Sequence, residues 1–390
     1  MNNHTKASFV VIGAGPAALC ALAKLLEIGI HANEITWIDP EFKVGDFGSK
    51  LSVGSSVPGN TSVASYQRVN KAIYKILVVH PPLFEIDNLA PDVICSLKIA
   101  AEPMQYITHE LRKRIISIEG YVTQIQTVAS EFKIEIKLSN NTFHHISSKR
   151  VIIATGSHPR SITLAKQHKS IKLIDPNITF IESELKKFLA EQQNAHTIAV
   201  IGSSHSAALA AMHLLQAGVT VHQFMNKDYK YAAPCISPEG IPYTMYDNTG
   251  LKGEVAKFTK KLISDLQENK SIYQHKIKYH MGKNTEDVFH LLENNLHVCS
   301  HAVAAIGYEI TDSLSINNNP ITDMTYNKLT LEFDIPMLYG IGIAFPQELK
   351  AISGEVESAV GYGKFWTSVN DKNILDAWKK NYKKQDKGNH

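Results

Sequence analysis

Short apolar runs alternate with helical patterns along most of this chain, and this alternation predicts an α/β fold. Residues 9–12 form an apolar, largely β-branched run that is typical of a buried parallel strand. A helical spacing of apolar residues follows over 19–26, and a second apolar strand is predicted at 34–38. This order predicts the first unit of a parallel sheet that is covered by helices.

The turn between the first strand and the first helix predicts a dinucleotide-binding site. It has the pattern G-x-G-x-x-A. Gly13 allows a tight turn, Gly15 leaves room for a pyrophosphate at the helix N-terminus, and Ala18 allows the helix to pack closely on the strand. Asp39 ends the second strand and is suited to accept a hydrogen bond from a ribose hydroxyl. The predicted binding residues of this unit are Gly13, Gly15, Pro16, Ala17, Ala18 and Asp39.

The same pattern recurs in the middle of the chain. Residues 197–201 predict a strand, and a helix and another strand follow. The turn reads G-S-S-H-S-A, so Ser204 stands where the second glycine is expected. Serine narrows the approach to a pyrophosphate, although its hydroxyl can donate to a phosphate oxygen. Two interpretations therefore stay open, a working nucleotide site and a domain kept for its architecture. The candidate residues are Gly202, Ser203, Ser204, His205 and Ser206.

Two side chains of this second unit have alternative interpretations. His205 either touches the nicotinamide ribose or covers the turn. Lys227 follows the closing strand, which ends without an acidic residue, and can pair with a 2′-phosphate. That interpretation favours NADPH over NADH. A solvated surface lysine is the alternative, because Asp228 beside it offsets the charge.

Further elements extend the pattern on both sides of the repeat. Helices are predicted at 63–78 and 103–116, and strands at 120–127, 132–138, 142–146 and 150–154. The last of these strands runs into Thr155 and Gly156, small residues that fit beside a cofactor. Residues 330–342 predict a hairpin, a buried strand and a glycine turn that ends at Gly342, and an amphipathic helix is predicted over 353–369.

Composition and charge narrow the class of protein. The 390 residues predict two or three domains, and 44% apolar with 20% charged residues is typical of a soluble globular protein. A net charge of +3 gives no indication of a nucleic-acid partner, and no apolar run approaches the roughly 20 residues that span a bilayer. Residues 1–8 do not resemble a signal peptide, and the four cysteines are widely spaced, so a cytoplasmic protein with reduced thiols and no membrane insertion is expected. No metal-ligand cluster is visible, and residues 376–390 are expected to form a basic, solvated tail.

Over nearly its whole length the chain resembles the two-dinucleotide-binding-domain flavoproteins, which use FAD and NAD(P)H. The resemblance implies two Rossmann-like, three-layer ββα domains, with the NAD(P)H domain (165–300) inserted in an FAD domain made of 1–158 and 302–390. The first glycine turn and Asp39 fall on the FAD motif of these proteins, Thr155 and Gly156 on their linker motif, and Gly342 on their closing flavin motif. The superfamily commonly has an aspartate after that last glycine, whereas this chain has Ile343.

The region after the second strand separates two branches of this superfamily. Disulfide reductases carry a C-x-x-x-x-C pair there, and residues 44–52 contain no cysteine, which excludes a thiol relay. The layout is closer to that of the class B flavin-dependent monooxygenases, because Gly45 and Gly48 precede Asn60, where that family places its active-site asparagine. An ordinary turn over 58–61 is the alternative for Asn60.

The resemblance implies an FAD-dependent NAD(P)H oxidoreductase. The leading hypothesis is a monooxygenase that hydroxylates nitrogen or sulfur of a small-molecule substrate. An NAD(P)H:acceptor flavin reductase without oxygen insertion and a non-catalytic flavin-binding or redox-sensing protein are the alternatives. The sequence leaves the substrate and the oligomeric state open, a homodimer included.

Overall fold

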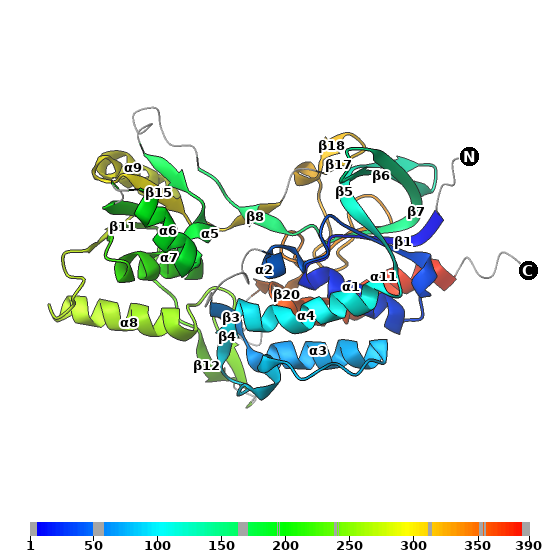
Figure 1. Ribbon diagram of the computed structural model, residues 1–390, viewed down its shortest axis with the longest axis horizontal. Coiled ribbons are helices and arrows are strands. Elements are labelled where there is room, and N and C mark those ends of the chain that lie inside the picture. Colours follow the sequence, from blue (N-terminus) through cyan, green and yellow to red (C-terminus); the bar gives the residue numbers. More distant parts are fainter. Residues whose placement is uncertain are drawn as a thin grey trace, which may run out of the picture. The chain divides into compact units, whose positions relative to one another are not determined.

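The chain divides into two compact units, both visible in the computed structural model of Figure 1. The structure describes residues 6–49, 58–162, 171–192, 194, 196–237, 240, 242–310, 314–350, 354 and 356–383. The first unit comprises Met1–Val53, Thr61–His158 and Ile310–His390, and the second comprises Gly54–Asn60 and Pro159–Glu309.

A mainly parallel sheet of eight strands forms the framework of the first unit. Its strands are β1 (Lys6–Ile12), β2 (Ile35–Asp39), β5 (Ile116–Val128), β6 (Glu131–Leu138), β7 (Phe143–Ile153), β17 (Ser315–Ile316), β18 (Asn319–Pro320) and β19 (Leu338–Gly340). The order is β18-β17-β5-β2-β1-β7-β19, and β6 pairs with both β5 and β7. Strands β5, β2, β1, β7 and β19 are parallel, whereas β6 is antiparallel to its two neighbours.

Two separate cores lie on the two faces of this sheet. One face is covered by the helices α1 (Pro16–Glu27), α3 (Val63–Leu77), α4 (Leu97–Arg112) and α10 (Tyr362–Val369). Phe9 and Val11 of β1 point into the core on this side, whereas Val10 and Ile12 point into a second core that β5 and β6 close. Because both faces of β1 are buried, its second half, residues 9–12, is continuously apolar. The three layers confirm the predicted ββα fold class.

Shorter elements complete the first unit and the connections between the units. They are α2 (Gly45–Ser49), β3 (Pro58–Ser62), β4 (Ile94–Ser96), β8 (Ser157–Pro159), β16 (Tyr308–Ile310), β20 (Glu348–Lys350), β21 (Val356–Ser358) and α11 (Lys372–Lys383). Strands β8 and β16 pair where the chain passes from one unit to the other and back.

The second unit contains a five-stranded sheet in the order β14-β11-β10-β15-β9, and every pairing in it is parallel. Its strands and helices are β9 (Lys172–Ile174), α5 (Pro176–Phe180), α6 (Glu182–Glu191), β10 (Thr197–Ile201), α7 (His205–Gln216), β11 (Thr220–Met225), α8 (Gly253–Gln267), β14 (Ile277–Met281), α9 (Thr285–Asn295) and β15 (His301–Ala304). A hairpin of β12 (Ala233–Ile236) and β13 (Pro242–Met245) interrupts the long loop after β11.

The C-terminal region departs from the sequence-based expectation at two places. The helix expected over 353–369 begins only at Tyr362, because β21 and Gly361, with φ +104°, precede it. Residues 376–383, assigned above to the basic tail, belong to α11. Trp378 of this helix is fully buried, with its ring 6.3 Å from that of Tyr339, so the packing of one indole holds this segment on the sheet. Residues 384–390 lie outside the described residues.

None of the helices in the described ranges has both the length and the apolar character that a bilayer crossing requires.

Candidate functional site

The first glycine turn lies where β1, β2 and β7 end together. Gly13 donates its N–H to the carbonyl of Ile38 at 2.8 Å, and Ala154 donates to the carbonyl of Ile12 at the same distance. Gly13 has φ +101°, and a Cβ there would lie 2.4 Å from the Ala154 carbonyl oxygen. Only glycine fits this position, because any side chain would push the turn off the end of β7.

The second glycine of the turn has a different reason for being glycine. Gly15 has φ −73° and ψ 176°, an extended conformation that any residue adopts, and a Cβ there would meet no described atom within 4 Å. It precedes Pro16 at the first position of α1, so the positive end of the helix faces the space that this missing side chain leaves. The arrangement fits a bound diphosphate.

Asp39 holds the loop beside this turn. One carboxylate oxygen accepts a hydrogen bond from the Ala14 N–H at 2.8 Å, and the other accepts from the N–H groups of Glu41 and Phe42 at 2.9 and 2.6 Å. The side chain is buried, and burial raises the pKa of Asp39 while the backbone donors partly oppose the shift. The predicted ribose acceptor therefore also shapes the loop, a role that the sequence analysis did not foresee.

Two further segments of the first unit carry predicted cofactor residues. Gly342 has φ +90°, and a Cβ there would lie 2.8 Å from the Cβ of Ala17, so the turn after β19 closes on α1. Gly156 has φ +73° and an open Cβ position, and it lies between Thr155 and Ser157. The hydroxyl oxygens of these two residues are buried without a hydrogen-bond partner among the described residues. Such groups are rare in proteins and fit a ligand with polar atoms. Sequence reasoning missed Ser157, because its burial depends on distant residues.

The second glycine turn repeats the first in detail. Gly202 donates to the carbonyl of Phe224 at 2.9 Å, and Ala305 donates to the carbonyl of Ile201 at 2.9 Å. A Cβ on Gly202 would lie 2.4 Å from the Ala305 carbonyl oxygen, as at the first turn. In each turn a side chain of the neighbouring strand donates a hydrogen bond to the carbonyl of the first glycine. Trp37 donates to the Gly13 carbonyl at 2.8 Å, and Gln223 donates to the Gly202 carbonyl at 3.1 Å.

Ser204 takes the backbone conformation of Gly15. Its φ is −92° and its ψ is −179°, so the serine causes no backbone strain at the N-cap of α7. The side chain is exposed, and its hydroxyl makes no capping hydrogen bond to the helix. Ser203 beside it is buried, and Ser206 is half-buried. The hydroxyl of Ser204 is therefore available to an anion at the start of α7.

His205 follows at the first position of the same helix. Neither ring nitrogen has a hydrogen-bond partner among the described residues, although both are buried. Burial, together with the nearby positive charge of Lys252, lowers the pKa of His205 to about 4, so the ring is neutral at pH 7. Lys252 forms an ion pair with Asp247 at 2.6 Å.

The end of β11 differs from the end of β2. In the first sheet Ile12 pairs with Ile38 of β2, and Asp39 follows Ile38. In the second sheet Ile201 pairs with Phe224 of β11, and the residue that follows Phe224 is Met225, which is buried. This position therefore offers no carboxylate to a ribose. Lys227 lies two residues further on, with its side chain exposed.

The remaining predicted site residue is Asn60. Its backbone belongs to β3, but its side chain lies outside the described residues, as do all of residues 50–57. Gly45 and Gly48 both belong to α2, and a Cβ on Gly45 would lie 3.4 Å from the Cα of Gly15. The stretch that precedes Asn60 thus begins beside the first glycine turn.

The four cysteines do not form a redox pair. Cys20, Cys95, Cys235 and Cys299 are all free thiols, and Cys235 alone is partly exposed. Cys20 lies nearest in sequence to the first turn, but burial raises its pKa well above the ordinary value. A buried, protonated thiol is a poor nucleophile, so this chain offers no dithiol relay.

Two glycine turns of matched geometry, each at the carboxyl ends of a parallel sheet, define a protein with two dinucleotide-binding folds in one chain. The chain belongs to the pyridine nucleotide-disulphide oxidoreductase family, which it matches over residues 7–314. It is a flavin-dependent oxidoreductase. The family is named for disulphide chemistry, but the cysteines of this chain do not form the redox pair that such chemistry needs.

Relatives and solved structures agree with this assignment. The monooxygenase AgnR1 of Paecilomyces divaricatus is 29% identical over an alignment that covers 97% of this chain and 99% of the relative. The ornithine N-hydroxylase KtzI of Kutzneria sp. 744 superposes with a TM-score of 0.60 at 11% identity, over 97% of this chain and 100% of that one. The bacillithiol disulfide reductase of Bacillus cereus superposes with a TM-score of 0.57 at 13% identity, over 96% and 99%. The two solved structures show a shared fold.

Proposed function

We propose that this protein is an FAD-dependent NAD(P)H monooxygenase that hydroxylates a nitrogen or sulfur atom of a small molecule. The pair of matched glycine turns carries the proposal, because two dinucleotide folds in one chain fit a hydride donor and a flavin acceptor. The absence of a redox-active cysteine pair argues against disulfide reduction. The monooxygenase relative, which aligns from end to end with this chain, supports oxygen insertion.

In this proposal the first unit holds FAD. Gly13 and Gly15 shape the cradle for its diphosphate, and the open Cβ position of Gly15 is the observation that fits this group. The unpartnered hydroxyl of Thr155 and the open position of Gly156 offer further contacts. Bound FAD supplies hydride acceptance and, once reduced, reaction with molecular oxygen. Ile343 provides no acidic side chain after Gly342, so the flavin end of the site relies on other groups.

The second unit is proposed to bind the nicotinamide nucleotide. Gly202 allows the close turn, and Ser203, Ser204, His205 and Ser206 present backbone and side-chain groups at the start of α7. With Met225 in place of an acid and Lys227 exposed nearby, the unit favours the 2′-phosphate of NADPH. Asn60 is proposed to lie beside the reacting atoms, where a neutral amide forms hydrogen bonds without transferring a proton.

Labelled oxygen tests the proposed reaction. The purified protein is expected to be yellow and to lose its flavin absorbance when NADPH is added without air. In ¹⁸O₂, a panel of small amines and thioethers is expected to include a compound that accelerates NADPH oxidation and gains one ¹⁸O atom by mass spectrometry. A matched reaction in ¹⁶O₂ with labelled water controls for exchange. NADPH oxidation with artificial acceptors but no labelled product across the panel would instead indicate an acceptor reductase.

Nucleotide binding is expected to be coupled to proton uptake at His205. An anion beside this ring favours the protonated form, so binding raises the pKa of His205 from about 4, and the affinity increases as the pH falls from 7 towards 5. Titration calorimetry of NADP⁺ in two buffers of different ionisation enthalpy measures the protons taken up. His205→Gln cannot accept a proton, and it is expected to show less uptake and a flatter pH dependence. Equal proton uptake by the two proteins would contradict this role, since the 2′-phosphate contributes the same protons to both.

A further inference from the structure

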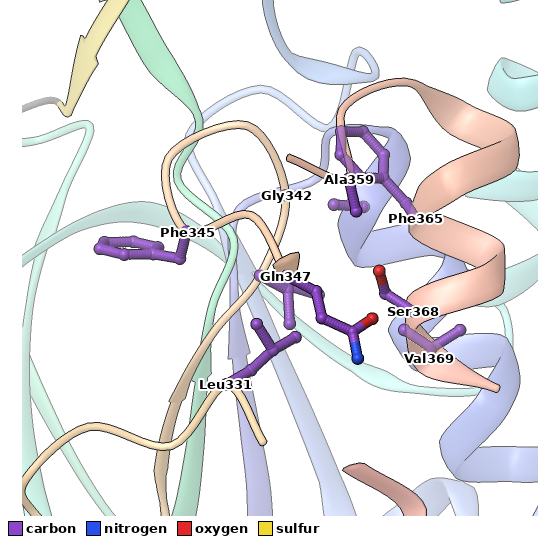
Figure 2. Close-up of a pocket in the computed structure, with 10 residues that line it drawn as sticks. Leu331, Gly342, Phe345, Gln347, Ala359, Phe365, Ser368 and Val369 are labelled. Carbon is purple, nitrogen blue, oxygen red and sulfur yellow. The ribbon is translucent and has the colours of Figure 1, made fainter. Parts of the chain in front are cut away.

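A small cavity lies inside the first unit, behind the turn that closes on α1. Ala17 of α1, Gly342 of the turn and Phe365, Ser368 and Val369 of α10 contribute to its wall. Figure 2 shows the side chains of Ser368 and Gln347 projecting into the same space from opposite sides. The cavity is partly open, and the space that the centre of a water-sized sphere can occupy in it is about 10 Å³.

The two polar residues of this cavity are incompletely satisfied. Gln347 is 3% exposed and Ser368 5% exposed. The side-chain oxygen of Gln347 and the hydroxyl of Ser368 have no hydrogen-bond partner among the described residues. The Gln347 amide group makes a long contact of 3.4 Å to the Leu329 carbonyl. Leaving such buried groups without a partner destabilises the folded state, and native proteins rarely do so.

Ser368 differs in this respect from the residue before it. Thr367 donates its hydroxyl to the Gly363 carbonyl one turn earlier at 3.1 Å, which is the usual solution for a hydroxyl inside a helix. The Ser368 hydroxyl makes no such bond and faces the cavity instead. It is therefore available to a partner inside the cavity.

We propose that this cavity is a binding site for an ordered water molecule, which bridges the side chains of Gln347 and Ser368. Water can donate to the Gln347 oxygen and also bond the Ser368 hydroxyl. The described residues that line the cavity are all uncharged, so an ion would be buried there without a counter-charge. The space for a water-sized sphere, about 10 Å³, is close to the roughly 10–15 Å³ that one buried water needs. Two buried polar side chains beside a space of this size match the surroundings of a buried water.

The water connects two segments that are distant in the sequence. Gln347 begins the β20–β21 hairpin, and its carbonyl accepts a hydrogen bond from the Ala359 N–H at 2.7 Å, just before α10. Ser368 lies near the end of that helix. Bridging the two side chains ties the base of the hairpin to α10, behind the Gly342 turn. The site itself is independent of the proposed function. Only the statement that this site supports a turn facing the flavin rests on the proposed function.

The Ser368→Ala variant tests the proposal through the sign of its effect on the stability of the full-length protein. If a water bridges Gln347 and Ser368, removing the hydroxyl takes away one hydrogen-bond partner of that water. The midpoint of thermal unfolding is then expected to fall by about 2–4 °C. If the cavity is dry, Ser368→Ala removes an unsatisfied buried group, and the midpoint stays or rises. An unchanged or raised midpoint would therefore overturn the proposal. Thr367→Val controls for loss of a hydroxyl on the same helix.

Two further measurements address the occupant and the coupling. A crystal structure at high resolution is expected to show one density peak within hydrogen-bond distance of both side chains, and a dry cavity, or one filled by another group, would contradict the proposal. Gln347→Met removes the other anchor with little change in size. If one water bridges both side chains, the double variant is expected to lose less stability than the sum of the losses of Ser368→Ala and Gln347→Met. Strict additivity would mean that nothing bridges the two residues.

Discussion

Replacing Gly15 by leucine is expected to yield a folded protein that lacks its flavin. The backbone at this position needs no glycine, and the new Cβ meets no described atom within 4 Å, so we expect the fold to be kept. The leucine occupies the space in front of the α1 N-terminus, where the proposed diphosphate lies. We expect the flavin affinity to fall on the order of a hundredfold or more, equivalent to about 3 kcal/mol. The ratio of flavin absorbance to protein absorbance measures the loss, and circular dichroism verifies the fold.

Gly13→Ala provides the matched comparison, because it changes the glycine two residues earlier. Its Cβ would lie 2.4 Å from the Ala154 carbonyl oxygen, at a φ of +101°. Here the fold itself is expected to suffer, by several kcal/mol or by failure to accumulate folded protein. A yellow Gly15→Leu protein with the normal flavin ratio would show that the diphosphate binds elsewhere.

Ser204→Asp is expected to weaken nicotinamide nucleotide binding strongly without loss of stability. Aspartate is a favourable N-cap residue, and its charge interacts well with the helix dipole, so α7 is expected to be as stable as before or slightly more so. The same negative charge repels a diphosphate at that helix end. An affinity for NADPH lower by about a hundredfold is expected, measured by quenching of nucleotide fluorescence.

Ser204→Gly is the control, since it restores the more usual residue of the motif and leaves the backbone conformation accessible. It is expected to bind NADPH at least as well as the natural protein. The flavin content of both variants should stay normal, because Ser204 lies in the second unit and the first glycine turn in the other. Tight binding of NADPH to Ser204→Asp would show that its diphosphate does not lie at the start of α7.

The buried strands and glycine turns were the elements that the sequence predicted best. The strand expected over 197–201 is β10 without any change, and that expected over 34–38 differs from β2 by one residue at each end. Both strands lie inside sheets and are almost completely buried, so continuous apolar runs identify them. The two glycine turns could be predicted because their first glycine is required. Gly13 and Gly202 each lie against a carbonyl oxygen that leaves no space for a side chain.

Long-range packing explains what the sequence could not predict. Strands expected separately at 142–146 and 150–154 form one continuous β7, because the strand changes partners midway from β6 to β1. The C-terminal segment reads as a solvated tail until Trp378 finds a buried position against the sheet. The same holds for the unpartnered hydroxyls of Thr155 and Ser157, whose burial no local pattern encodes.

The order in which the first unit is assembled follows from its divided sequence. In the folded sheet of the first unit, β7 pairs with β19, and Ile152 is paired with Tyr339. During synthesis the ribosome produces β7 before most of the second unit and β19 only after all of it. Over that interval β7 has an open edge, and open edges attract strands of other nascent chains. The growing polypeptide therefore depends on timely arrival of its own last eighty residues or so, or on a chaperone that shields this edge until they emerge.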